Sequence, residues 1–155
     1  MTAYYGTNAT LRDQTVPSGK CGVGEVNGRL RIAYDEWAVP AAVIAINSTV
    51  DLFEIPKDAR VLECVMTYPD QGTTGTGKLG WLASDDAVEA ADDNGLLLSI
   101  DFKTAADSVS AVNASTPPAG LGKKFAAKVR AQLLIDEAFD AGTGTIKCWV
   151  MYILD

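Results

Sequence analysis

The sequence predicts an all-β protein: an antiparallel β-sandwich of the jelly-roll kind, forming a single domain behind an extended N-terminal arm. Apolar residues recur at every second position in several short segments, and stretches rich in glycine, proline and aspartate separate these segments. Helical periodicity is nearly absent. Only residues 84–93 could form a short helix, and the apolar stripe of that helix would be too narrow for a core position. We therefore expect roughly eight strands in two packed layers.

Residues 1–27 are expected to form the arm, and residues 28–155 the sandwich. The arm has no sustained apolar period and is interrupted by Pro17 and several glycines, which is typical of irregular or extended backbone. Charge is also unevenly distributed. Residues 1–34 hold four basic and two acidic residues, whereas the rest of the chain holds nine basic and 18 acidic residues.

Alternation of period two begins at residue 29, where Leu30, Ile32 and Tyr34 share one face of a predicted strand. Further strands are predicted over 50–55, 61–68, 79–83, 96–102, 129–135 and 146–154. In three of them one apolar set is expected to face the core: Leu62, Cys64, Met66 and Tyr68; Leu96, Leu98, Ile100 and Phe102; Val129, Ala131, Leu133 and Ile135. The last strand is apolar on both faces, which predicts a central position in a sheet.

The stretch VPAAVIAINS at 39–48 is apolar and precedes the strand at 50–55. Its side chains Pro40, Val43, Ile44 and Ile46 either belong to the core or, if they are exposed, seal a contact within a trimer. The core interpretation is favoured.

The composition excludes several classes of chemistry. The chain contains no histidine, so imidazole bases, histidine-dependent triads and histidine-ligated zinc are excluded. Cys64 and Cys148 lie in apolar runs, where a cysteine usually fills the core. The net charge of -7 argues against nucleic acid as a partner. No run of about 18 apolar residues occurs, so we expect a soluble protein with no membrane partner and no cleaved leader.

One short motif favours an enzyme. The segment GTTGTGKLG at 72–80 matches the phosphate-loop pattern G-x-x-x-x-G-K-S/T through Gly72, Gly77 and Lys78. In addition, Asp136 and Glu137 end an apolar strand, as do the magnesium-binding acidic residues of many ATPases. A small NTPase is therefore an alternative function.

The context of this motif argues against nucleotide binding. A phosphate loop opens a helix, whose free N–H groups receive the phosphates, and a hydroxyl follows its lysine. Here Leu79 stands in the hydroxyl position, and the residues after it suit a strand. We therefore expect 69–77 to be a hairpin connection, and we expect no catalytic residue, metal or cofactor.

Two other constellations are weaker. The acidic residues of 85–93 lack the spacing of a calcium loop and are expected to form a solvated loop. A carbohydrate-binding sandwich would use Trp37, Trp81 and Trp149 as stacking platforms, although Trp149 is expected to lie in the core of its central strand.

The chain resembles the decoration, or cement, proteins of tailed bacteriophages, which are small β-sandwich proteins associated with capsids. The resemblance rests on GRLRIAYDEW at 28–37, INSTVDLFEIPKDARVLECVMTYPD at 46–70, and the segments GTGKLGW, GLGKKF and GTGTIKCWVMYILD. It covers most of the chain from Gly28 onward, whereas the arm matches poorly. These motifs mark strands and turns and carry no catalytic residue.

The resemblance implies a virion protein that is assembled in the host cytoplasm and binds the outside of an icosahedral capsid. There it would stabilise contacts between major capsid protein subunits, as a homo-oligomer, often a trimer. A head-fibre base is the alternative within the virion. We expect the arm to contact the capsid through Tyr4, Tyr5 and Leu11 as apolar anchors and through Arg12 and Lys20 at acidic patches. The competing expectation is an arm folded over the edge of its own sheet.

Overall fold

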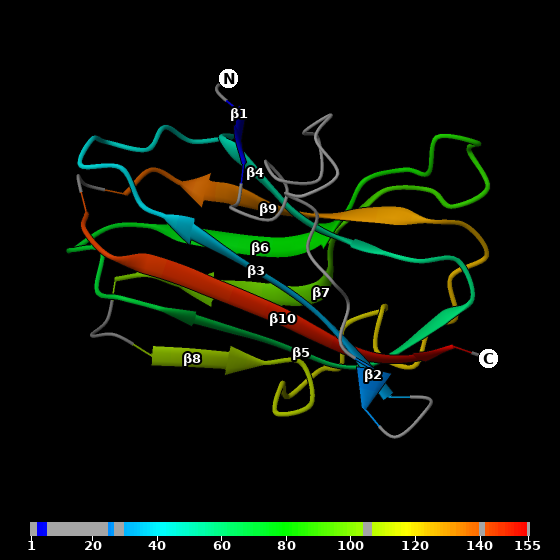
Figure 1. The fold of residues 1–155 in the computed structure, drawn as a ribbon. Helices are drawn as coiled ribbons and strands as arrows, with labels where there is room; N and C mark the ends of the chain where they lie inside the picture. Colours follow the sequence, from blue (N-terminus) through cyan, green and yellow to red (C-terminus); the bar gives the residue numbers. More distant parts are fainter. Residues whose placement is uncertain (1–2, 6–24, 27–29, 104–106, 140–141, 155) are drawn as a thin grey trace.

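Two β-sheets pack face to face in a computed structural model that describes residues 3–5, 25–26, 30–103, 107–139 and 142–154 (Figure 1). For residues 3–5 and 25–26 it describes the backbone. The described residues form ten strands and no helix, so the short helix considered at 84–93 is absent. Within these residues there is accordingly no helix long and apolar enough to cross a membrane.

Each sheet has five strands in the described part of the chain. Sheet 1 has the order β1 (Ala3–Tyr5), β4 (Thr49–Ile55), β9 (Val129–Glu137), β6 (Thr76–Trp81) and β7 (Asp92–Asp101). Sheet 2 has the order β2 (Glu25–Val26), β3 (Leu30–Ala38), β10 (Thr145–Leu154), β5 (Ala59–Tyr68) and β8 (Asp107–Ser110). All neighbours are antiparallel except β1, which runs parallel to β4.

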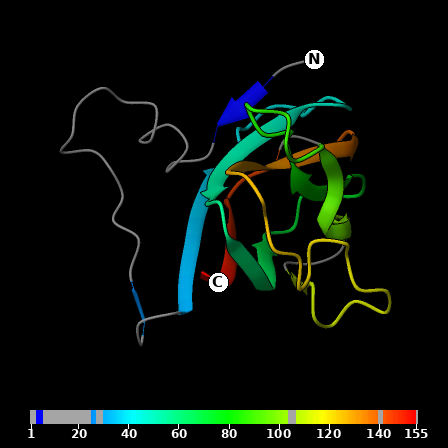
Figure 2. The same cartoon turned by 90° about the vertical axis from the view of Figure 1, so that its right-hand side faces the viewer.

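The strand order confirms the predicted sandwich and its jelly-roll topology. Strands β3 to β10 alternate between the sheets, except at the step from β6 to β7, and give the orders β3-β10-β5-β8 and β4-β9-β6-β7. Figure 2 shows this arrangement from the side, with the long connection between β8 and β9 at one flank. Strand β10 is central in sheet 2, as its two apolar faces predicted.

The connection from β5 to β6 corrects one prediction. It is not a hairpin, because β5 belongs to sheet 2 and β6 to sheet 1. The chain crosses the sandwich beside Phe102, which accepts a hydrogen bond from the Gln71 N–H (3.3 Å) and donates one to the Gly75 carbonyl (3.1 Å). Residues that sequence alone assigned to a turn between neighbouring strands therefore link the two layers.

Turns replace the helix considered at 84–93 because side chains there bond to the local backbone. The Ser84 Oγ accepts from the Glu89 N–H (2.9 Å) and donates to Asp86 (2.6 Å). Asp86 in turn accepts from the Val88 N–H (3.2 Å). Such local bonds compete with helical ones.

The core consists of side chains that alternate inward from the two sheets. The predicted set on β9 is fully buried, and on β10 the same holds for Ile146, Cys148, Val150 and Tyr152. Cys64 and Cys148 are buried free thiols, as expected of core cysteines. Burial and an interaction with Cys64 raise the pKa of Cys148 well above its usual value, which keeps the thiol protonated.

Two β-bulges shift the predicted alternation by one residue. In β5 the pairing steps from Val61–Tyr152 to Glu63–Met151, so Val61 is buried and Leu62 is exposed. In β7 a similar shift buries Leu97 and exposes Leu98. An extra residue in one strand reverses the faces beyond it, which a strict period of two does not reveal.

The residues predicted to share one face of β3 lie on the outer side of its sheet. Its inward side chains are Ala33, Asp35 and Trp37, whereas Ile32 and Tyr34 point outward and are exposed. Both faces of this strand carry apolar residues, so alternation alone did not say which one is inside. The bulky indole of Trp37 fills the core.

The stretch at 39–48 divides between core and surface. Ile44 is fully buried and pairs with Phe139, while Val43 and Ile46 are exposed. The core prediction is therefore right for Ile44 and wrong for its two neighbours.

The described parts of the predicted arm lie at sheet edges. Ala3–Tyr5 pairs with Thr49–Asp51 at the edge of sheet 1, and Glu25–Val26 pairs with Leu30–Arg31 at the edge of sheet 2. The predicted division after residue 27 falls outside the described residues.

Candidate functional site

The glycine-rich segment is a strand and has no phosphate-loop geometry. Gly77 and Lys78 lie inside β6, which is paired on one side with β9 and on the other with β7. A phosphate loop needs a helix N-terminus to supply free N–H groups, and no helix occurs in the described residues. The structure does not support the alternative of an NTPase.

The glycines of this strand allow close packing. A Cβ at Gly77 would lie 2.9 Å from the Leu134 carbonyl oxygen and 3.0 Å from the Phe102 ring, and one at Gly80 would overlap the Asp92 carbonyl oxygen. Glycine is needed at both positions because the neighbouring strands leave no room for a side chain.

The lysine of the apparent phosphate loop and the two acidic residues that end β9 all form ion pairs on the outer face of sheet 1. The Lys78 Nζ lies 3.1 Å from Asp93 and 3.2 Å from Asp136. The hydrogen bond that Lys78 donates to Asp93, reinforced by Asp136, raises the pKa of Lys78 even though burial opposes this. Glu137 pairs with Lys103 at 2.8 Å. Two carboxylates beside one ammonium repel a triphosphate.

We therefore predict that magnesium and ATP leave the melting temperature unchanged, measured by differential scanning fluorimetry at millimolar nucleotide. Replacing Lys78 with alanine should lower the free energy of unfolding by only about 0.2–1 kcal/mol, the usual value of a solvent-accessible ion pair. An ATP-dependent rise in melting temperature that Lys78→Ala abolishes would contradict this reading.

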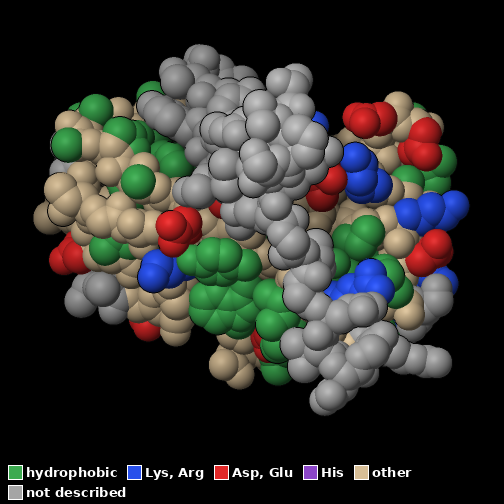
Figure 3. Space-filling view, in the orientation of Figure 1, with side chains coloured by type: hydrophobic (Ala, Val, Ile, Leu, Met, Phe, Trp, Pro, Cys, Tyr) green, Lys and Arg blue, Asp and Glu red, His purple; other side chains and the backbone are tan. Residues whose placement is uncertain are grey.

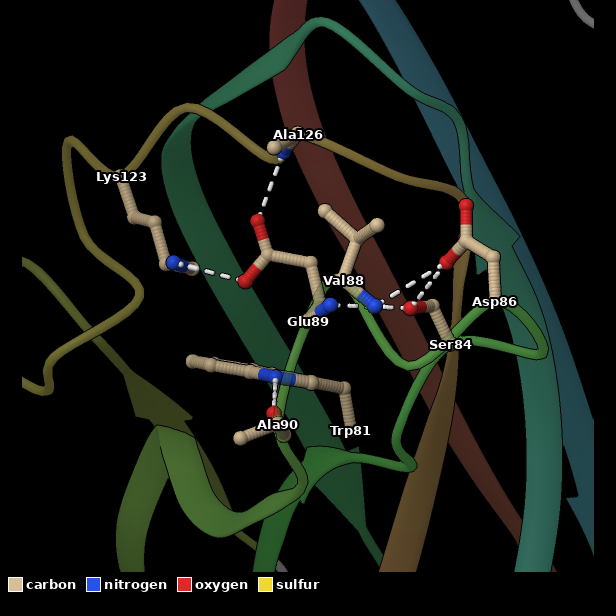
Figure 4. Close-up of polar contacts among 8 residues, drawn as sticks. All are labelled: Trp81, Ser84, Asp86, Val88, Glu89, Ala90, Lys123 and Ala126. Carbon is tan, nitrogen blue, oxygen red and sulfur yellow. Dashed lines mark hydrogen bonds and ion pairs between the residues drawn. The ribbon is translucent and has the colours of Figure 1, made fainter.

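A buried carboxylate, Glu89, connects two loops at one end of the sandwich (Figure 4). It accepts hydrogen bonds from the Ala126 N–H (2.6 Å) and pairs with the Lys123 Nζ (2.9 Å). Lys123 also lies over the rings of Trp81 (5.9 Å) and Phe125 (5.4 Å), which pack edge to face. The loop after β6 is thus fastened to the loop before β9.

Glu89 is built to remain ionised. Burial alone would raise its pKa, but the hydrogen bond from Ala126 and the contact with Lys123 outweigh this, so the pKa lies below the usual value. A general base poised near neutral pH needs the opposite shift. We conclude that this group holds the loops together.

The acidic residues at 85–93 are divided among separate structural roles. Asp86 caps the turn at Ser84, Glu89 binds Lys123, and Asp93 binds Lys78. Among the described residues no three metal-ligating side chains converge. A hollow beside this loop, lined by Glu54, Asp85 and Lys128 among others, holds about 90 Å³, well below the roughly 300–1,000 Å³ of small-molecule sites.

The tryptophans do not form a platform for sugars. Trp37 and Trp81 are buried, and the Trp81 Nε1 donates a hydrogen bond to the Ala90 carbonyl (2.9 Å). Trp149 is half-buried and points outward from β10, so the expectation that it lies in the core was wrong. A single accessible indole gives weak support to the carbohydrate alternative.

The outer faces of the two sheets differ in chemistry. On sheet 1, Asp51 accepts hydrogen bonds from Arg130 (3.0 Å) and Gln132 (2.6 Å), and Lys128 pairs with Glu54 (3.2 Å). Together with the ion pairs of Lys78, these contacts give a polar surface of matched charges, as expected where a sheet faces water.

The outer face of sheet 2 carries an apolar cluster, which we call the aromatic face: Ile32, Tyr34, Val65, Trp149 and Met151. Strand register places Trp149 between Tyr34 and Val65, and Met151 beside Ile32. In Figure 3 hydrophobic side chains gather near the centre of the face that β3 and β10 present. Contiguous exposed apolar surface of this kind marks contact sites.

A second uncharged surface lies between β7 and β8, the strands at one flank of the sandwich. This edge groove has a volume of about 270 Å³. Its lining is apolar or hydroxyl-bearing throughout: Leu97, Leu98, Ser99, Val109, Ser110, Ala111, Ala114, Ser115, Thr116 and Pro118.

The predicted capsid contacts are placed only in part. The backbones of Tyr4 and Tyr5 pair with Val50 and Asp51, and Leu11, Arg12 and Lys20 lie outside the described residues. Sequence reasoning missed the aromatic face. The available signal was that β3 and β10 are apolar on both faces although each sheet has a single inner face.

Structural comparison finds the same fold in chains from two phage capsids. No protein-family model and no curated protein matches the sequence. A chain from the capsid of Ralstonia phage GP4 matches over 99% of both chains with a TM-score of 0.69 and 16% identity. A chain of the cyanophage Pam1 capsid asymmetric unit matches over 93% of this chain and 96% of that one, with a TM-score of 0.58 and 17% identity. This chain shares their fold.

Proposed function

We propose that this chain is a structural protein of a phage virion that binds the outside of an icosahedral capsid and stabilises contacts between major capsid protein subunits. The observation that carries the proposal is the match of nearly the whole chain with chains from two phage capsids. At such low identity the match concerns the fold, so the role itself remains our inference.

The surface chemistry supports a binding role over a catalytic one. Carboxylates and cations that could serve chemistry are matched in pairs, as at Lys78 and Glu89. The aromatic face and the edge groove offer uncharged area for protein contacts instead. A clamp needs such area on a rigid body that symmetry repeats, and the jelly roll supplies the body.

Within this proposal, residues 1–27 form a capsid-contacting arm that precedes a sandwich of residues 28–155. Tyr4, Tyr5 and Leu11 are its apolar anchors, and Arg12 and Lys20 meet acidic capsid patches. The protein acts as a homotrimer on the capsid exterior. Because many symmetric copies bind, their small contact energies add up and stiffen the shell.

Addition of purified protein to expanded capsids that lack it tests this function. Wild type should bind in many symmetric copies, visible by electron microscopy, and should raise the temperature at which the capsids rupture. No binding would refute a decoration role, and density at a single vertex would indicate a head-fibre base.

The arm is tested by the combined substitution Leu11→Ser, Arg12→Glu and Lys20→Glu, which keeps the chain intact where a deletion would remove β1 and β2. We expect capsid binding to weaken at least tenfold, measured by cosedimentation. The variant Lys103→Glu, which alters an exposed charge on the sandwich, serves as the control. Unchanged binding by the arm variant would refute the arm assignment and leave the decoration role standing.

A further inference from the structure

Two surfaces of this chain carry no net charge and lie on different parts of the sandwich. The aromatic face stands on the flat outer side of sheet 2 at its central strand, and the edge groove lies at the flank where β7 and β8 end the two sheets. The face presents the side chains of Trp149, Tyr34 and Ile32, and the groove offers an apolar hollow. A side chain can therefore enter the groove.

The size of the groove suits the side chains of a partner. At about 270 Å³ it is smaller than the roughly 300–1,000 Å³ typical of small-molecule sites. Its lining contains no charged residue, so it does not select a charged ligand.

Charge selects these two surfaces as the ones through which two copies of the chain can meet. The chain has a net charge of -7, so two copies repel each other over most of their surfaces. The aromatic face is bordered by Glu36 and Lys147 at one end and by Glu63 and Arg60 at the other, which balance to zero. With the groove also uncharged, these two surfaces can meet without like-charge repulsion.

We propose that copies of this chain associate head to tail, with the aromatic face of one copy seated on the edge groove of the next. This inference rests on the proposed function for its setting, since a clamp repeated by symmetry needs such a contact. Because the two surfaces differ, the contact is heterologous, and it closes into a cyclic trimer when each copy is rotated by one third of a turn. The same arrangement buries Trp149.

Sedimentation velocity of the full-length protein, without capsids, tests the contact. Ile32→Arg places a charge on the face and Leu98→Arg places one in the groove, at side chains of nearly equal exposure (38% and 36%). Val43→Arg is the control, since Val43 is 65% exposed and belongs to neither surface. Wild type and Val43→Arg should sediment as trimers, and the other two variants as monomers.

An equimolar mixture of Ile32→Arg and Leu98→Arg distinguishes head-to-tail pairing from other contacts. The first variant keeps an intact groove and the second an intact face, so one good contact forms and the mixture should sediment as a dimer. If Leu98→Arg alone keeps the wild-type oligomer, or if the mixture stays monomeric, the proposal is wrong. Tyr34→Arg and Ser99→Arg replace the first pair if either of those variants unfolds.

Fluorescence gives a second readout on the unmodified protein. Trp37 and Trp81 are buried within the chain, so a change in indole exposure on dissociation reports on Trp149. Dilution below the dissociation constant should shift the emission to longer wavelength in wild type and leave the monomeric variants unchanged. A wild type that is monomeric in sedimentation would refute this contact, while its addition to capsids would still support the proposed function.

Discussion

Replacing Phe102 with alanine is expected to lower the free energy of unfolding by about 3–5 kcal/mol, the usual loss for a buried phenylalanine. Phe102 is fully buried, and its ring packs edge to face on Tyr68 (5.1 Å between centroids) and against Phe139 (5.3 Å). Tyr68 belongs to sheet 2, whereas Phe102 directly follows β7 of sheet 1. The cavity left by alanine would therefore open between the two layers.

Chemical denaturation in urea measures this loss, provided that the slope of the unfolding free energy against denaturant is unchanged. Phe102→Leu retains most of the apolar volume and should cost less than half as much. Val43→Ala, on the surface, should stay within about 0.5 kcal/mol of wild type. A loss below about 1 kcal/mol for Phe102→Ala would mean that this ring does not hold the layers together.

Replacing Glu89 with alanine is expected to cost about 2–3 kcal/mol at neutral pH. The change leaves the Ala126 N–H and the Lys123 ammonium without their shared acceptor. Lys123 is about one third exposed and regains water, which keeps the cost in the lower part of the range for a broken buried pair. Glu89→Gln keeps an oxygen for Ala126 and should cost about 1 kcal/mol.

The effect of Glu89 should depend on pH with a definite sign. Its pKa in the folded protein lies below the usual 4.5, so its contribution is complete above that value and is lost as the pH falls through the folded pKa. The difference in unfolding free energy between wild type and Glu89→Ala should thus be constant near neutral pH and shrink as the pH falls through the lowered pKa. A difference that grows on acidification would mean that Glu89 is not the ionised acceptor described above.

The strands were predictable because a strand with one buried face alternates apolar and polar residues, whichever strands it pairs with. The segment at 129–135 shows this, since its inward residues are those expected. The partners of each strand were not predictable in this way. Residues 69–75 join two different sheets, and a turn-rich sequence does not specify where the next strand pairs.

The candidate contact surfaces were harder to find than the strands. Ile32, Tyr34 and Trp149 look like core residues in sequence, because an apolar side chain on an interface resembles one in a core. The two bulges compounded the difficulty by exposing Leu62 and Leu98 in place of their neighbours. The arm residues proposed to contact the capsid remain predictions.

By itself the sequence determined the all-β class, the central position of the last strand, and the absence of histidine chemistry. These follow from composition and from local periodicity, which can be read from the sequence without knowing how the strands pack. The tertiary structure alone decided that Lys78 pairs with the carboxylates of Asp93 and Asp136, and which side of sheet 2 faces outward. Those outcomes depend on strands distant in the chain, such as β9 beside β6 and β3 beside β10, and on the space between two packed layers.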